Sequence, residues 1–141
     1  MVDDADYPRL REPEAIRTKV AVVAVVLTVA AWLAWLGWDQ QRNPDETGPY
    51  EAWQVVGLAL TLAVVAAASS WWSVDLSEAM VVVVLMAAAL TVSASIDWAT
   101  DKTPDASFWM LGAGFLFAGT MLGLWLVAGL TRGVWQWTHR S

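Results

Sequence analysis

Four apolar segments, each long enough to cross a lipid bilayer, constrain the fold of this chain more than any other feature. The clearest is Ser77–Trp98, which reads SEAMVVVVLMAAALTVSASIDW and carries acidic side chains only near its ends, at Glu78 and Asp97. An α-helix rises about 1.5 Å per residue, so about 20 apolar residues cross a hydrocarbon core of about 30 Å. We therefore predict an all-α fold, an integral membrane bundle of four transmembrane helices arranged as two hairpins.

Apart from Glu78 and Asp97, the charged residues fall between these segments and in the two ends of the chain. The predicted spans cover about 20–38, 53–72, 77–98 and 108–130, in a domain at 20–134 with polar tails at 1–19 and 131–141. Of the 141 residues, 57% are hydrophobic and 16% charged, and the spans leave no room for a separate soluble domain. We expect Pro8 and Pro13 to break any long helix in the first tail. That tail is either a solvated segment or a docking segment for a cytoplasmic partner or anionic lipid.

A cleaved signal peptide is an alternative for the first segment. Basic residues precede the apolar run, and Val29-Ala30-Ala31 resembles a cleavage site. The run nevertheless continues to Trp38 and starts behind an acidic tail, which makes it longer and later than a typical signal sequence. These features favour an uncleaved transmembrane helix.

Basic residues predict the orientation, because cytoplasmic segments of membrane proteins carry an excess of Lys and Arg. Six of the eight lie in the tails, at Arg9, Arg11, Arg17, Lys19, Arg132 and Arg140, and two lie in loops, at Arg42 and Lys102. Tryptophans, which settle at the headgroup level, form two groups: Trp35, Trp38, Trp53, Trp98 and Trp109, and then Trp71, Trp72, Trp135 and Trp137. Few Lys beside abundant Ala, Val and Gly are typical of a high-GC bacterial genome. We predict a bacterial cell (inner) membrane protein with both termini cytoplasmic.

The connection between the second and third spans allows only a tight hairpin. Asp75 lies three residues before Glu78, where its carboxylate is placed to accept from the free N–H groups that begin the third helix. A negative charge there also suits the positive end of the helix dipole. We therefore predict that Asp75 caps the third helix.

A faint repeat relates the two halves of the chain. Asp39 ends the first span and is followed by Pro44-Asp45, whereas Asp97 ends the third span and is followed by Pro104-Asp105. Two parallel hairpins from a duplication would produce this pattern. Chance recurrence of Asp and Pro at the ends of spans would produce it as well, and both interpretations stay open.

Small residues form a ridge on the fourth span. The ridge consists of Gly114, Ala118, Gly119 and Gly123, and it includes a GxxxG motif. In lipid, helices associate by close packing, and small residues let their backbones approach. The ridge is expected either to pack inside the bundle, for which alanines of the second span offer a matching surface, or to form a homodimer.

Asp97 is the strongest candidate for a functional residue, because an ionisable side chain in a membrane is costly to bury. It lies about 30 Å along its helix from Ser77, which places it at the outer interface, within reach of water. Ser93 and Asp97 are four residues apart and share a helix face, and Asp101 continues near it. This face is either an ordinary interfacial surface or a polar site for a cation or a proton.

Composition excludes several classes of function. The chain has no cysteine, which excludes disulfides, thiolate metal sites and thiol-redox chemistry. Its net charge of −6 argues against nucleic-acid binding. His139 is the single histidine, no known catalytic motif is present, and the acidic loops show no metal-ligand spacing. The first span has no acid, unlike that of the small multidrug-resistance transporters. We predict no cofactor, no metal site and no catalytic residue.

The run Gly48–Gly57, GPYEAWQVVG, together with Ile96-Asp97-Trp98, resembles small four-helix integral membrane proteins of actinobacteria that have no assigned function. The resemblance covers about 20–130 and implies a fold class and a location, without an activity. We expect a non-enzymatic accessory, structural or partner-binding membrane component. The alternative is a small transporter or channel that uses the face of Ser93 and Asp97. Expected partners are the lipid bilayer and either a second copy or another membrane protein.

Overall fold

The computed structural model describes residues 11–37, 50–73, 75–100 and 109–138. Over these ranges the chain forms four helices, α1 (Arg11–Trp35), α2 (Ala52–Trp72), α3 (Leu76–Thr100) and α4 (Trp109–Thr138). Each of them contains a stretch that is long and apolar enough to cross a membrane. The prediction of an all-α chain with four helices of membrane-spanning length is confirmed.

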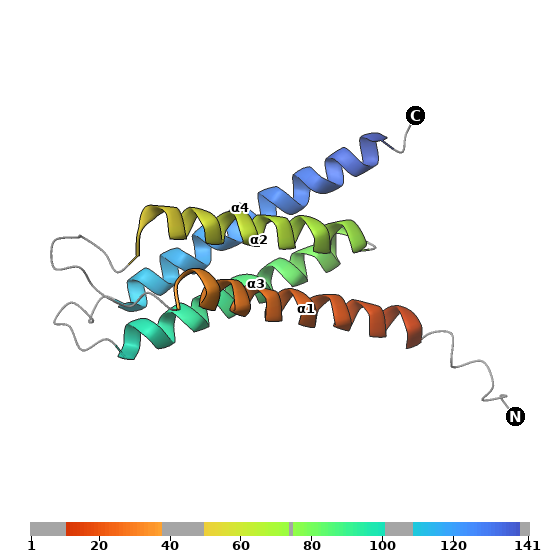
Figure 1. Ribbon diagram of the computed structural model, residues 1–141. Coiled ribbons are helices and arrows are strands. Elements are labelled where there is room, and N and C mark those ends of the chain that lie inside the picture. Colours follow the sequence, from red (N-terminus) through yellow and green to blue (C-terminus); the bar gives the residue numbers. More distant parts are fainter. Residues whose placement is uncertain (1–10, 38–49, 74, 101–108, 139–141) are drawn as a thin grey trace, which may run out of the picture.

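The helices form two antiparallel hairpins, α1–α2 and α3–α4, that lie side by side (Figure 1). α1 packs against α2 and α3, and α4 packs against the same two helices. α2 and α3 are joined by the shortest connection but touch more sparsely, because they lie across a diagonal of the bundle. α1 is therefore parallel to α3, and α2 to α4 (Figure 1). We call the end where α2 passes into α3 the turn end, and the opposite end the loop end.

Two helices extend beyond the predicted spans. α1 begins at Arg11, so the prediction that Pro13 would interrupt a helix is wrong. Proline is tolerated there because N–H groups in the first turn have no partner within the helix. α4 continues to Thr138 through residues expected to form a tail, and Figure 1 shows its last turns running past the end of α2.

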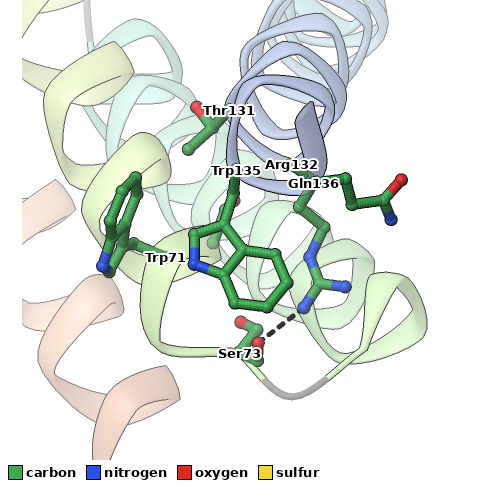
Figure 2. A pocket seen from close by; sticks show the side chains of 7 residues that line it. Trp71, Ser73, Thr131, Arg132, Trp135 and Gln136 are labelled. Carbon is green, nitrogen blue, oxygen red and sulfur yellow. Dashed lines mark hydrogen bonds between the residues drawn. The ribbon is translucent and has the colours of Figure 1, made fainter. Parts of the chain in front are cut away.

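A helix cap, an ion pair and a hydrogen bond hold the turn end together. Asp75 caps α3 as predicted, because its Oδ1 accepts from the Glu78 backbone N–H at 2.9 Å and from the Ser77 hydroxyl at 2.6 Å. Arg17 of α1 forms an ion pair with Glu78, with 2.6 Å between Nε and Oε1, which joins the starts of two parallel helices. Arg132 of α4 donates from Nη2 to the carbonyl of Ser73 at 2.5 Å (Figure 2).

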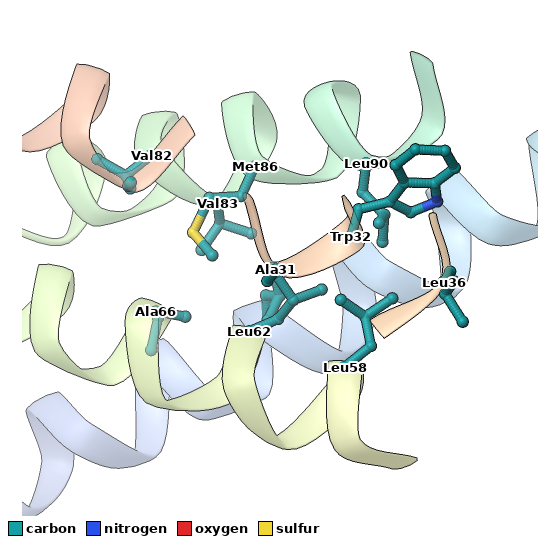
Figure 3. Close-up of a cluster of buried hydrophobic side chains, with 13 residues drawn as sticks. Ala31, Trp32, Leu36, Leu58, Leu62, Ala66, Val82, Val83, Met86 and Leu90 are labelled. Atoms are coloured by element: carbon teal, nitrogen blue, oxygen red, sulfur yellow. The ribbon is translucent and has the colours of Figure 1, made fainter. Parts of the chain in front are cut away.

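The core is built from small and medium-sized apolar residues spaced by three or four positions. Met86 of α3 lies at its centre and is fully buried, beside Val83 and Leu90 of the same helix (Figure 3). α2 contributes Leu58 and Leu62 to the same cluster. A helix repeats every 3.6 residues, so this spacing places one stripe of each helix in the core.

The outer surface of the bundle is also apolar. Large hydrophobic side chains are exposed along the middle of every helix, among them Val22, Val26, Leu60, Val64, Val84, Val92, Phe115, Leu122 and Leu126. A water-soluble bundle would place polar residues at such positions. The described helices are therefore apolar on their inner and outer faces alike, as helices surrounded by lipid are.

At the loop end, each hairpin is closed by a tryptophan packed on a glycine. A Cβ on Gly57 of α2 would lie 2.5 Å from the Trp35 ring of α1, and a Cβ on Gly112 of α4 would lie 3.1 Å from the Trp98 ring of α3. Both glycines are thus positions where the backbone approaches an indole closely. The two hairpins share this arrangement, although most residues of the repeat seen in the sequence lie outside the described ranges.

Candidate functional site

Asp97 lies near the end of α3 and is half-buried at the loop end. Its Oδ2 accepts a hydrogen bond from the Tyr50 hydroxyl at 2.5 Å. Tyr50 stands just before α2 and packs against the apolar core. The contact therefore joins the entrance of α2 to the end of α3, helices that are otherwise in sparse contact.

Ser93, which belongs to the predicted polar face, and the nearby Thr100 both donate to backbone carbonyls of α3. The Ser93 hydroxyl donates to the carbonyl of Ala89 at 2.9 Å, one turn back on its own helix. The Thr100 hydroxyl donates to the carbonyls of Ile96 and Asp97. Asp101 lies outside the described residues. The structure thus pairs the Asp97 carboxylate with Tyr50, whereas the Ser93 hydroxyl bonds to a backbone carbonyl of its own helix.

A second polar cluster at the loop end organises the start of α2. The Glu51 backbone N–H donates to Gln54 Oε1 at 2.8 Å, which is one half of a capping box. Gln54 is buried, and the indole N–H of Trp53 donates to Glu51. The bond from Glu51 to Gln54 satisfies one of the backbone N–H groups at the start of the helix, and the bond from Trp53 joins two side chains.

Trp35 links this cluster to α1. Its indole Nε1 donates to the Thr61 hydroxyl at 3.1 Å, and its ring meets that of Trp53 edge-on, with centroids 6.0 Å apart and planes at 72°. Trp35, Trp53 and Trp98 all belong to one end of the bundle in the structure, as the sequence predicted. The side chains of Trp38 and Trp109 are outside the described part.

Sequence reasoning missed the partner of Asp97. Tyr50 precedes α2 at the same end of the bundle where Asp97 closes α3. Among the described residues, no three His, Cys, Asp or Glu side chains gather as a metal site would require. The chemistry visible at this site is a tyrosine–aspartate hydrogen bond that connects two helices.

The predicted glycine ridge faces outward. Gly114, Ala118, Gly119 and Gly123 are all exposed on α4. A Cβ added to any of these three glycines would meet no atom within 4 Å. The ridge therefore does not pack against another described helix, whereas Gly57 and Gly112, which lie outside it, do.

No protein-family model, curated protein or solved structure matches the chain.

Proposed function

We propose that this chain is a multi-pass protein of the bacterial cell (inner) membrane, with both tails in the cytoplasm. The support is the apolar outer surface of four membrane-length helices, together with the excess of Lys and Arg in the two tails. In this orientation the turn end faces the cytoplasm, because α1 begins there and α4 finishes there (Figure 1). The resemblance to four-helix membrane proteins of actinobacteria stays a prediction.

Within that location we propose a non-enzymatic accessory subunit that binds a transmembrane helix of another membrane protein, or of a second copy, through α4. One observation carries this proposal: 6% of the α4 span is buried within the molecule, against 39% of the α3 span. The small residues of α4 lie on its free side, between large exposed side chains such as Phe115 and Leu122. Small residues on an exposed helix face let a second helix approach closely in lipid.

The alternative, a small transporter or channel using Ser93 and Asp97, has less support. The carboxylate already receives the Tyr50 hydroxyl, and the serine hydroxyl donates to a backbone carbonyl. Below them, the interior of α3 is lined by Met86, Ala87 and Leu90, which are apolar and buried. A transport role requires that Asp97→Asn abolish an ion- or pH-dependent flux in reconstituted vesicles.

Affinity purification in a mild detergent tests the accessory role. The wild-type protein is expected to retain a stoichiometric partner, and the double variant Gly119→Ile, Gly123→Ile is expected to lose it. Both glycines have open space around them, so the variant should keep its own fold. Far-UV circular dichroism of the purified variant checks this point.

Ala30→Ile is the matched control, because Ala30 is a small exposed residue on a different helix, α1. The control should retain the partner. A wild-type protein that purifies alone and monomeric would contradict the accessory role. Retention of the partner by the double variant would exclude the face of α4 that contains Gly119.

A further inference from the structure

A cavity of about 160 Å³ opens at the turn end, between the end of α2 and the last turns of α4 (Figure 2). Ser70 and Trp71 of α2 line it together with Ser73, which follows that helix, and α4 contributes Arg132, Trp135 and Gln136. Sequence reasoning used Arg132 only as an orientation signal. In the structure, this arginine lines the cavity.

The Arg132 guanidinium has donors that the protein does not use. A guanidinium carries five N–H groups, and one of them, on Nη2, reaches the Ser73 carbonyl. Nε is buried but has no hydrogen-bond partner among the described residues. A buried donor without an acceptor costs free energy, so an acceptor supplied from outside would be favoured.

Among the described residues that line the cavity, none is a carboxylate that would neutralise this charge. Two acids of the turn end are engaged elsewhere, because Glu78 pairs with Arg17 and Asp75 accepts from Ser77 and the Glu78 backbone. The other polar wall residues are uncharged. Arg132 therefore gives the cavity a net positive charge.

The surroundings are those of a lipid headgroup. Trp71 and Trp135 line the cavity and are about half exposed, and indoles concentrate at the level of the headgroups. Trp125 lies two helical turns from Arg132 on the same side of α4 and is also exposed. This apolar surface would accommodate acyl chains beside the cavity. Basic pockets between helices on the cytoplasmic side are typical sites for anionic headgroups.

We propose that this cavity binds the phosphate of an anionic phospholipid, with the guanidinium of Arg132 as the principal donor and the Gln136 amide at its rim. Arginine suits this role because its planar N–H groups match the geometry of phosphate oxygens. The proposal rests on the membrane location proposed above. It is independent of the partner surface on α4.

The test is a native mass-spectrometry titration of the purified full chain in detergent, with phosphatidylglycerol and, separately, phosphatidylcholine. The wild type should bind one phosphatidylglycerol in preference to phosphatidylcholine. Arg132→Gln should weaken binding of phosphatidylglycerol about tenfold, because a charged hydrogen bond to phosphate is lost. Lys19→Gln is the control: it removes one positive charge from an exposed position on α1, outside the cavity, and should leave binding unchanged.

A second pair of variants keeps the Arg132–Ser73 bond intact, in case Arg132→Gln fails to fold. Gln136 is exposed at the rim, so Gln136→Glu should weaken binding of phosphatidylglycerol and Gln136→Lys should strengthen it. Equal affinity of all variants for both lipids would overturn the proposal. Displacement of the lipid by equimolar inorganic phosphate would assign the cavity to a free anion instead. The membrane location is tested separately by cysteine labelling, so a failure of the lipid proposal can be told apart from a failure of the membrane location.

Discussion

Trp35 shows at the scale of a single residue how the loop end is assembled. Its indole packs on Gly57, its N–H donates to Thr61, and its ring edge meets Trp53. All three partners belong to α2. One side chain of α1 thus holds the entrance of the neighbouring helix, and the hydrogen side chain of Gly57 is what makes room for it.

Gly57→Ala should destabilise the protein. The new methyl group would lie 2.5 Å from the Trp35 ring, and such overpacking costs about 1–3 kcal/mol of the free energy of unfolding. Gly119→Ala is the matched control, because its Cβ would meet nothing within 4 Å. Unfolding by sodium dodecyl sulfate in mixed micelles, followed by circular dichroism, measures both. Equal stability of the two variants would contradict the close approach.

Tyr50 and Asp97 should depend on each other energetically. The hydroxyl donates to the carboxylate, so Tyr50→Phe and Asp97→Ala each remove the same interaction, worth about 1 kcal/mol at a partly exposed site. In a double-mutant cycle, the double variant should be hardly less stable than either single one. Strictly additive losses of unfolding free energy would show that the two side chains are not coupled.

α3 is the central element of the bundle, and its start depends on Asp75. Hydrogen bonds from the Ser77 hydroxyl and from the Glu78 backbone lower the pKa of the Asp75 carboxyl below its usual value. A lowered pKa in the folded state means that the charged cap stabilises the fold above the unfolded pKa, about 3.9. That stabilisation is lost as the pH falls through the lowered folded pKa.

Acidification should therefore loosen the first turn of α3 only below the usual aspartate range. The protection factor of the Glu78 amide, measured by hydrogen exchange, should stay level above that range and fall beneath it. Asp75→Asn keeps an acceptor oxygen but cannot titrate, so in that variant the protection factor of the Glu78 amide should not change with pH. A carbon NMR titration that places the Asp75 carboxyl at or above its usual pKa would refute this account.

At the scale of the whole molecule, two hairpins lie in parallel, so residues of the turn end and of the loop end should face opposite sides of a membrane. Ser77 and Thr100 are exposed at the two ends of α3. The chain has no cysteine, so Ser77→Cys and Thr100→Cys each introduce a unique label site.

With a membrane-impermeant maleimide, intact cells should label Thr100→Cys at once. Ser77→Cys should react only after the cells are permeabilised, because the turn end is proposed to be cytoplasmic. The opposite pattern would invert the orientation. Labelling of both variants in intact cells would argue against a membrane-spanning α3.

Sequence alone was sufficient for the number and type of helices, for the cap by Asp75 and for the grouping of tryptophans. These features depend on local properties, namely the length of apolar runs and the chemistry of residues at helix starts. The extent of α4 was underestimated, because polar residues from Thr131 onward resemble a tail. Their hydroxyls instead bond to the helix, as Thr131 does to the carbonyl of Val127.

Only the tertiary structure decided which helices are neighbours, and the candidate sites follow from that. Tyr50 pairs with Asp97, and the cavity around Arg132 likewise joins residues from two helices. The spacing of these residues along the chain does not predict either contact. The ridge that includes Gly119 was expected either to pack inside the bundle or to form a homodimer, and the structure leaves it outside the packed interior. Each helix of this chain has several faces of similar hydrophobicity, so the sequence alone does not determine which face is buried. The arrangement of the four helices determines it.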